Sequence, residues 1–329
     1  MKFEEFLAEW RNDSPTVLVH TSGSTGEPKP MWVEKRRMEA SARMTCDFLG
    51  LHEGDTALLC LPLDYIAGKM MVVRSLVRGL RLICVEPNGE PLETVEFPVV
   101  FAAMVPLQVW NSLRHPLQRE RLMAIRNLII GGGAIDDAMA EELRTFPNAV
   151  WSTYGMTETL SHIAMRRLNG PEATVWYTPL PGVGLSLTDE GCLVIDAPAL
   201  HDGPLVTNDI AEIEVLQGNY FLPYREGGDF RFRILGRKDN VICSGGIKIQ
   251  AEEVERQLRA HLREPFIITK RRDEKFGEVA VLLTEGDTAE AEAVCHRELP
   301  KFWQPHAYIH IDHIPMTATG KPKRTIPYF

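Results

Sequence analysis

The sequence predicts an α/β protein with a large parallel sheet, a small antiparallel β subdomain and a small C-terminal α+β domain. Short apolar strands alternate with amphipathic helices between residues 16 and 154, the pattern of a parallel sheet flanked by helices. From about residue 174 the strands become short and alternating, with frequent turns, which favours an antiparallel sheet. We therefore expect domains at 1–238 and 239–329, with the β-rich subdomain at about 174–238.

The elements follow from hydrophobic period and from Gly and Pro stops. In the large domain the sequence predicts helices at 3–10, 34–49, 106–114 and 136–146, and strands at 16–19, 57–61, 81–86, 97–102, 128–130 and 150–154. A further helix is expected to begin within 61–70 and to end near Gly79. The subdomain strands are TVWYTP, GVGLSLTDEG, CLVIDA, AEIEVL and FRFRIL. In the C-terminal domain a turn, a strand, a glycine pair and a helix occupy 236–258, followed by strands at 265–270, 278–284 and 307–312 and a helix at 288–299.

Composition limits the class of protein. Of 329 residues, 44% are hydrophobic and 25% are charged, which is typical of a globular protein with ample core. The net charge of −9 argues against nucleic-acid or anionic-membrane partners. The six scattered cysteines include no C-x-x-C, and the acidic first ten residues have no apolar signal segment. We expect reduced cysteines and a cytoplasmic location.

In the segment VLVHTSGSTGEPK, residues 17–29, a predicted buried strand breaks into six residues of Ser, Thr and Gly. Glycine permits a loop whose N–H groups converge on one side, and hydroxyls and a lysine add donors and charge. This pattern predicts a cradle for a polyphosphate, and the alternative is a flexible Ser/Gly linker. The donors are Thr21, Ser22, Gly23, Ser24, Thr25, Gly26 and Lys29.

A second segment, STYGMTET at 152–159, follows a predicted strand end, where open α/β sheets bind ligands. Tyr154 offers a flat face for a base, Thr157 a hydroxyl for a phosphate, and Glu158 a carboxylate suited to Mg²⁺. The glycines at 131–133 also follow a strand end and would let a ring lie on the backbone. A polar turn and a tight turn are the purely structural alternatives.

Three further segments carry polar side chains. Asp209, in a predicted loop between strands, suits a ribose diol, and its alternative is a turn aspartate. Arg237 suits a ribose or a phosphate, and Asp239 a hinge. Lys321, in PMTATGKPK, suits the negative charge that develops at a transferring phosphorus, and its alternative is a solvated basic tail.

The order and spacing of TSGSTGEPK, LPLDYIAG, GGGAI, YGMTET, TND, GRKDNVICSGG and PMTATGKPKR resemble the adenylate-forming superfamily of acyl-CoA synthetases, adenylation domains and luciferases. The resemblance runs from about residue 16 to 326. Within the superfamily, LPLDYIAGKMM and YGMTETLSHIA look most similar to the o-succinylbenzoate–CoA ligases of menaquinone biosynthesis.

The resemblance implies an AMP-forming ligase that uses ATP, Mg²⁺ and a carboxylic acid, and then CoA as acyl acceptor. It implies that Lys321, Thr157 and Glu158 are catalytic, with Glu158 as the Mg²⁺ ligand. It also implies that the C-terminal domain turns about Asp239. The implied nucleotide and CoA contacts are the 21–29 donors, Gly132, Gly133, Tyr154, Gly155, Asp209, Arg237, Gly245 and Gly246.

The chain departs from the family pattern in its short segment before the phosphate loop. From this we expect an acyl pocket that is either more open or completed by a second subunit in a homodimer. On the acyl side the resemblance points to Tyr65, Lys69, Ser161 and His162. Lys69 is either a partner for a substrate carboxylate or a lysine that snorkels to the surface. The alternative functions are an adenylation enzyme that loads a carrier protein and a non-catalytic nucleotide-binding protein.

Overall fold

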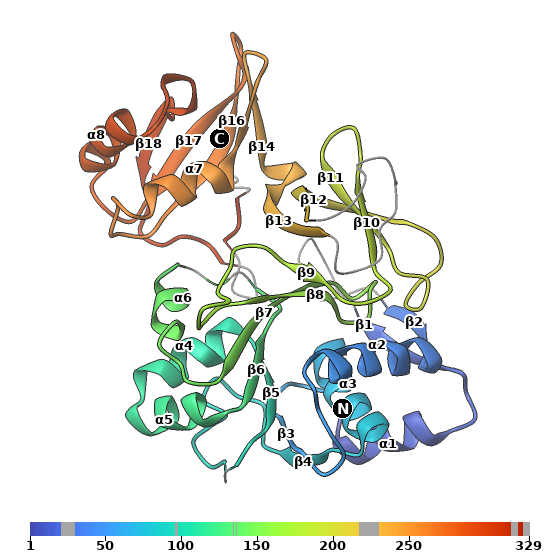
Figure 1. The fold of residues 1–329 in the computed structure, drawn as a ribbon. Helices are drawn as coiled ribbons and strands as arrows, with labels where there is room; N and C mark the ends of the chain where they lie inside the picture. Colours follow the sequence, from blue (N-terminus) through green and yellow to red (C-terminus); the bar gives the residue numbers. More distant parts are fainter. Residues whose placement is uncertain are drawn as a thin grey trace. The chain divides into compact units, whose positions relative to one another are not determined.

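The computed structural model (Figure 1) describes residues 1–20, 30–95, 98–133, 135, 137–216, 230–316 and 322–324. The chain divides into two compact units. The first comprises Met1–Leu185, Ile195–Leu205 and Ile213–Phe232, and the second comprises Ser186–Val194, Val206–Glu212 and Arg233–Phe329. The boundary that the sequence predicts at residue 238 stays a prediction.

A seven-stranded sheet with the order β4-β3-β5-β6-β7-β8-β9 forms the centre of the first unit. Strands β3 to β7 pair in parallel, as predicted, whereas β8 and β9 are antiparallel additions. The strands are β3 (Thr56–Leu59), β4 (Arg81–Cys84), β5 (Phe101–Met104), β6 (Asn127–Ile130), β7 (Ala149–Gly155), β8 (His162–Arg167) and β9 (Thr178–Pro179). The sequence does not predict β8, and most of the predicted TVWYTP strand is irregular.

The helices of the first unit are α1 (Phe3–Arg11), α2 (Lys35–Phe48), α3 (Ile66–Arg78), α4 (Pro106–Arg114), α5 (Pro116–Ala124) and α6 (Asp137–Leu143). Helix α3 ends at Gly79, whose φ of +67° is the left-handed conformation that glycine adopts at helix ends. From Gly68 to Ser75 every residue of α3 is buried. Everything in that stretch, charged residues included, is therefore removed from water.

Strand β1 (Thr16–His20) pairs antiparallel with β2 (Pro30–Glu34) in a separate two-stranded sheet. Val17 and Val19 are fully buried, as the alternating apolar pattern predicts. The sequence analysis did not predict β2. Pro30 is the first residue of that strand, a position that tolerates the missing N–H donor.

A four-stranded sheet contains, in sequence order, β10 (Gly184–Leu187), β11 (Cys192–Asp196), β12 (Leu205–Val215) and β13 (Phe230–Arg237). Strand β12 continues through the segment that the sequence predicts to be a loop. Asp209 therefore stands inside a strand, and the predicted loop position is wrong. The reason is that Thr207, Asn208 and Asp209 look like turn residues, although the Thr207 hydroxyl bonds to the Leu193 carbonyl across the sheet.

The remainder of the second unit is the predicted α+β fold. Its elements are η1 (Lys238–Asn240), β14 (Val241–Ser244), β15 (Ile247–Gln250), α7 (Ala251–Leu258), β16 (Phe266–Asp273), β17 (Gly277–Thr284), α8 (Thr288–Glu298), η2 (Lys301–Trp303) and β18 (Ala307–His310). Helices α7 and α8 cover one face of its sheet around Ile268 and Leu282. Ile267, Val281 and Leu283 form the core on the other face.

Within the described residues, no helix has the length and hydropathy of a membrane-spanning segment. All six cysteines are free, and four of them are buried. Burial raises the pKa of Cys60 to about 12 and that of Cys295 to about 11. These two thiols are therefore neutral core groups at neutral pH.

Candidate active site

The carboxyl ends of β6 and β7 place two of the predicted loops next to each other. The two strands pair in parallel, so the glycines at 131–133 leave the sheet beside the 152–159 segment. A Cβ atom at Gly131 would stand 2.4 Å from Thr153 Oγ1, which leaves room for glycine alone. The glycine-rich edge and the YGMTET segment therefore lie together at the end of the sheet where α/β proteins bind ligands.

Tyr154 belongs to a cluster of three aromatic rings. Its ring packs edge-to-face on Phe232 at a centroid distance of 5.3 Å and lies 5.9 Å from the ring of Tyr177. Tyr177 stacks on Phe232 at 5.5 Å, and its hydroxyl lies 2.9 Å from Ser152 Oγ. The cluster holds the half-buried Tyr154 ring in one plane, which stacking of a flat base requires. The sequence analysis did not name Tyr177 or Phe232, although both are aromatic residues in predicted strands.

The turn after Tyr154 is closed by close backbone contacts. A Cβ atom at Gly155 would stand 2.2 Å from the Ser161 carbonyl oxygen. The buried Thr159 hydroxyl accepts a hydrogen bond from the Met156 amide and lies 2.7 Å from the same Ser161 oxygen. The protein therefore shapes this turn with its own hydrogen bonds.

The two predicted catalytic side chains of this turn differ in exposure. Thr157 is 7% exposed, whereas Glu158 is an exposed residue. Proteins commonly bind Mg²⁺ through one or two carboxylates together with substrate phosphates and water. The described residues contain no group of three or more Asp, Glu, His or Cys side chains that would hold a metal ion. An accessible single carboxylate at Glu158 fits a magnesium–nucleotide complex.

A buried chain of hydrogen bonds joins α2, α3 and the start of β8. Arg74 of α3 donates from Nη2 to Ser161 Oγ at 2.5 Å. Ser161 Oγ lies 3.3 Å from His162 Nδ1, and His162 Nε2 lies 3.0 Å from Thr45 Oγ1 of α2. The structure therefore brings together Ser161 and His162, the predicted acyl-side residues, and adds Arg74 and Thr45, which the sequence analysis missed.

Arg74 is fully buried, at 2% exposure, and has no carboxylate partner among the described residues. Its polar contacts there are Ser161 and the Met71 sulfur at 3.8 Å, and its Nε has no hydrogen-bond partner. Burial lowers the pKa of Arg74 to about 10, so the guanidinium keeps its charge at neutral pH. A buried cation without a counterion is costly, which favours a site that receives an anion. The available signal was an arginine inside the apolar run MMVVRSLV.

Lys69 is also buried on α3, but it faces a different neighbour. Its Nζ lies 3.6 Å from Glu9 Oε2 of α1 and 4.9 Å from the centre of the Phe6 ring. At 1% exposure it is no surface lysine, so the snorkelling alternative is wrong. Tyr65, just before α3, is 47% exposed. Lys69 thus lies beside a protein carboxylate, whereas Arg74 has none among the residues that the structure describes.

Three predicted residues of the second unit lie together near η1. Arg237 Nη1 lies 3.5 Å from Asp209 Oδ1, and its Nη2 lies 4.0 Å from Asp239 Oδ2. Asn208 Nδ2 donates to Asp239 Oδ2. The predicted ribose-binding pair and the predicted hinge residue are therefore parts of one polar cluster, and the sequence analysis did not name the Asn208 contact.

Gly245 and Gly246 form the turn between β14 and β15. Both have positive φ angles, +56° and +86°, which require glycine or strain. The Gly245 amide donates to the Phe276 carbonyl at 2.9 Å. Both glycines are exposed, so their backbone is accessible to a ligand.

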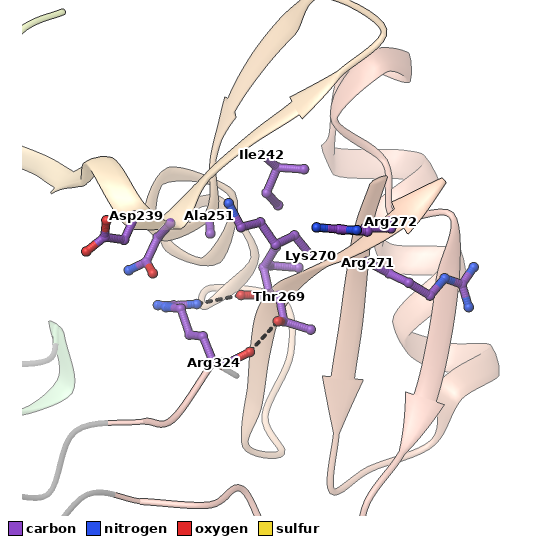
Figure 2. Close-up of a pocket in the computed structure, with 10 residues that line it drawn as sticks. Asp239, Ile242, Ala251, Thr269, Lys270, Arg271, Arg272 and Arg324 are labelled. Atoms are coloured by element: carbon purple, nitrogen blue, oxygen red, sulfur yellow. Dashed lines mark hydrogen bonds between the residues drawn. The ribbon is translucent and has the colours of Figure 1, made fainter. Parts of the chain in front are cut away.

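Figure 2 shows a pocket of about 640 Å³ in the second unit. Asp239, Asn240 and Ile242 line it together with Lys270 and Arg324. Lys270 lies 3.1 Å from Glu278, and Arg324 pairs with Glu255 through both guanidinium nitrogens. The Thr269 hydroxyl donates to the Arg324 carbonyl at 2.5 Å, which fastens residues 322–324 to β16. These cations hold the unit together.

Several predicted site residues lie outside the described residues. They are Thr21, Ser22, Gly23, Ser24, Thr25, Gly26 and Lys29 of the phosphate loop, and Lys321. Their roles stay predictions.

The fold and the site define an α/β protein with a glycine-rich ligand edge on its parallel sheet and a separate α+β unit. Residues 4–210, more than half of the 329 residues, match the model of the family described as AMP-binding enzyme. The chain therefore belongs to the AMP-binding enzyme family, which confirms the resemblance to adenylate-forming enzymes.

Relatives with curated names agree with this family. The 2-succinylbenzoate–CoA ligase of Salmonella typhimurium is 28% identical over 310 residues, which cover 91% of this chain and 65% of the relative. The enzyme of the same name from Listeria innocua is 25% identical over 96% of this chain and 70% of its own length. This chain thus spans 65% of the length of the Salmonella relative.

Solved structures share the fold. An acyl-CoA synthetase (AMP-forming)/AMP-acid ligase II-like protein from Dyadobacter fermentans is 31% identical, with a TM-score of 0.66, and the match covers 97% of this chain and 91% of that one. Escherichia coli MenE, bound to an analogue of OSB-AMS, is 25% identical with a TM-score of 0.71, and the match covers 94% of this chain and 68% of that one.

Proposed function

We propose that this chain activates a carboxylic acid with ATP to an acyl-adenylate, transfers the acyl group to CoA, and takes o-succinylbenzoate as the acid. Family membership and the names of the relatives support the reaction type. The buried Arg74 carries the choice of acid. The acid has two carboxylates, one of which stays ionised when the other is activated. When that second carboxylate is buried, it needs a positively charged hydrogen-bond donor that no protein carboxylate already neutralises.

In the first step, an oxygen of one carboxylate attacks the α-phosphorus of ATP, and pyrophosphate leaves. Residues 21–29 are proposed to bind the β- and γ-phosphates, and Glu158 the Mg²⁺ that offsets their charge. Tyr154 and the glycines at 132–133 are proposed to hold adenine. Lys321 is proposed to stabilise the charge that builds up between carboxylate and phosphorus, so its loss is expected to slow this step by about 10²-fold or more.

In the second step, the CoA thiol attacks the acyl carbon and AMP leaves. The adenylate is already activated, so the protein needs to supply no nucleophile. The exposed backbone of Gly245 and Gly246 is proposed to flank the pantetheine arm after the C-terminal part turns about Asp239. Asp239→Pro is expected to spare acyl-adenylate formation and to impair thioester formation. Equal losses in pyrophosphate release and thioester yield would remove the hinge role.

ATP–pyrophosphate exchange with a panel of carboxylic acids, followed by addition of CoA, tests the proposal. We expect exchange with o-succinylbenzoate and a CoA thioester as product. If exchange occurs without a CoA thioester and a carrier protein is loaded instead, the acyl acceptor is a carrier protein and not CoA. Exchange with other acids alone would reject o-succinylbenzoate, and no exchange with any acid would reject the enzyme function.

A further inference from the structure

We infer that His162 and Thr45 are positioning residues for Arg74. They hold the Ser161 hydroxyl so that its oxygen accepts from the guanidinium, and this aims Arg74 at the second carboxylate of the acid. The inference rests on the proposed function, because it needs an acid with two carboxylates. The inference adds a chain of hydrogen bonds that runs from Ser161 through His162 and Thr45 to the carbonyl oxygen of Ser41 on α2.

The direction of the chain follows from which atoms can donate. Thr45 Oγ1 lies 3.1 Å from the Ser41 carbonyl oxygen. That oxygen can only accept, so the hydroxyl of Thr45 donates its single hydrogen to it. Thr45 must then accept from His162 Nε2–H, and the neutral ring keeps a lone pair on Nδ1. Ser161 donates to that nitrogen and accepts from Arg74, which can only donate. The tautomer of His162 is assigned by this network.

The surroundings keep His162 neutral. It is 7% exposed, and burial, followed by the charge of Arg74, lowers the pKa of His162 well below the ordinary value. On α2 the neighbouring Cys46 is a neutral thiol, because burial raises its pKa. A protonated ring would donate from both nitrogens, and Ser161 would lose its acceptor. The donors and acceptors along these hydrogen bonds are therefore fixed, with each group from Arg74 to Thr45 donating to the next.

The chain leaves Arg74 with unused donors. Nη2 donates to Ser161 Oγ at 2.5 Å, Nη1 lies 3.8 Å from the Met71 sulfur, and Nε has no hydrogen-bond partner among the described residues. A guanidinium fixed at one nitrogen is oriented before the substrate arrives, which lowers the entropy cost of a two-point contact with a carboxylate. His162 contacts Ser161, and Thr45 contacts His162, so both residues act on the guanidinium indirectly through the Ser161 hydroxyl.

Thr45→Val tests the inference, since valine keeps the shape and removes the acceptor. Thr45→Ser, which keeps the hydroxyl, is the matched control. The acids are o-succinylbenzoate and its two one-carboxylate analogues, 4-oxo-4-phenylbutanoate and 2-butanoylbenzoate. For Thr45→Val we expect the KM for o-succinylbenzoate to rise about tenfold. We expect less than a twofold change in the KM for ATP and for whichever analogue is turned over. The serine variant should behave like the wild type.

Equal losses with the diacid and the analogue, or the same loss in the serine variant, would overturn the inference in favour of a structural role. A second readout does not depend on activity. Nitrogen-15 spectra of histidine-labelled protein should show His162 neutral, with its proton on Nε2, between pH 6 and 8. A proton on Nδ1, or titration near 6.5, would overturn the relay even if no acid is activated, and inactivity of the wild type alone would reject only the proposed function.

Discussion

Two buried cations on α3 have opposite environments. Lys69 lies near the start of the helix, 3.6 Å from Glu9 of α1, with its ammonium over the ring of Phe6. Arg74, five residues later, contacts a serine hydroxyl and a methionine sulfur and has no described carboxylate partner. The lysine therefore has a counterion, whereas the described part of the chain supplies none for the arginine. This difference is the reason for our proposal that Arg74 and not Lys69 binds the substrate carboxylate.

Arg324 in the second unit is a partly buried cation, with 18% of its side chain exposed, and like Lys69 it has a carboxylate partner. Its guanidinium contacts both oxygens of Glu255 and donates to the Ile268 carbonyl at 2.6 Å. Glu255 is 4% exposed and also accepts from the Ile268 amide. The carboxylate of Glu255 therefore offsets the charge of Arg324. Lys69 and Arg324 both lie beside a carboxylate, whereas Arg74 has none among the described residues.

The largest effect is expected for Arg74→Met, which removes the unpaired charge and keeps most of the volume. Loss of one partner of a buried charge pair costs about 2–5 kcal/mol, so kcat/KM for the diacid should fall roughly a hundredfold or more. The melting temperature without substrate should stay level or rise, because a desolvated charge is gone. Steady-state kinetics and calorimetry measure both. A marked drop in stability with unchanged kinetics would class Arg74 with the paired cations.

Glu255→Gln should give the opposite pair of results. It leaves the partly buried Arg324 beside a neutral amide, which is expected to cost about 3 kcal/mol of unfolding free energy. Urea unfolding followed by circular dichroism measures the loss, and Glu253→Gln, at a partly exposed ion pair of the same helix, is the matched control with less than about 1 kcal/mol. Comparable losses in both variants would contradict the special weight given to the buried pair.

Glu9→Gln tests the counterion of Lys69 with a smaller expected cost, about 1–2 kcal/mol, because Glu9 is about a quarter exposed and the pair is 3.6 Å apart. The kinetic constants of the folded enzyme for the diacid should not change. Urea unfolding measures the loss of stability in Glu9→Gln, and steady-state kinetics on the same preparation measures KM and kcat for the diacid. A raised KM for o-succinylbenzoate with unchanged stability would move Lys69 back to the substrate side.

The smallest effect is a dependence of stability on pH. Burial lowers the pKa of Lys69, against the opposing pull of Glu9. The unfolded chain then binds more protons than the folded one at pH values between the lowered pKa and the ordinary 10.5, so the contribution of Lys69 to stability rises with pH in that window. Urea unfolding of the wild type and of Lys69→Met between pH 7 and 10 isolates the term as a difference. A difference that falls as pH rises would reverse the assigned shift.

Much of the fold could be read from local patterns. The helix at 106–114 has the predicted bounds, and Gly79 ends α3 as predicted, because both signals lie in neighbouring residues. Strand β8 could not be found this way. The chain reverses before it at Leu160, whose φ of +65° is unusual for a branched residue and has no sequence signal. The strand at Asp209 was not predicted because Thr207, Asn208 and Asp209 are residue types that are common in turns.

The glycines and hydroxyls of the candidate site could be predicted from the sequence. The roles of its buried charged residues, Arg74 and Lys69, could not. Gly131–Gly133 and the YGMTET segment meet because parallel strands end at one edge, a rule that needs no coordinates. Ser161 and His162 entered through family resemblance. The role of Arg74 depends on which carboxylates lie near it, and that is a tertiary fact. The same holds for Lys69, whose partner Glu9 is sixty residues away.

Gly155 has a consequence for how this sequence can vary. One hydrogen atom there is all that separates β7 from the carbonyl of Ser161. A methyl group would push apart the strand that carries the aromatic ring of Tyr154 and the segment that holds the serine and histidine. The adenine contact and the acid contact that we propose would then change together under a single substitution. A laboratory search for new acid specificity should therefore leave this glycine unchanged and vary residues of α2 and α3 near Arg74.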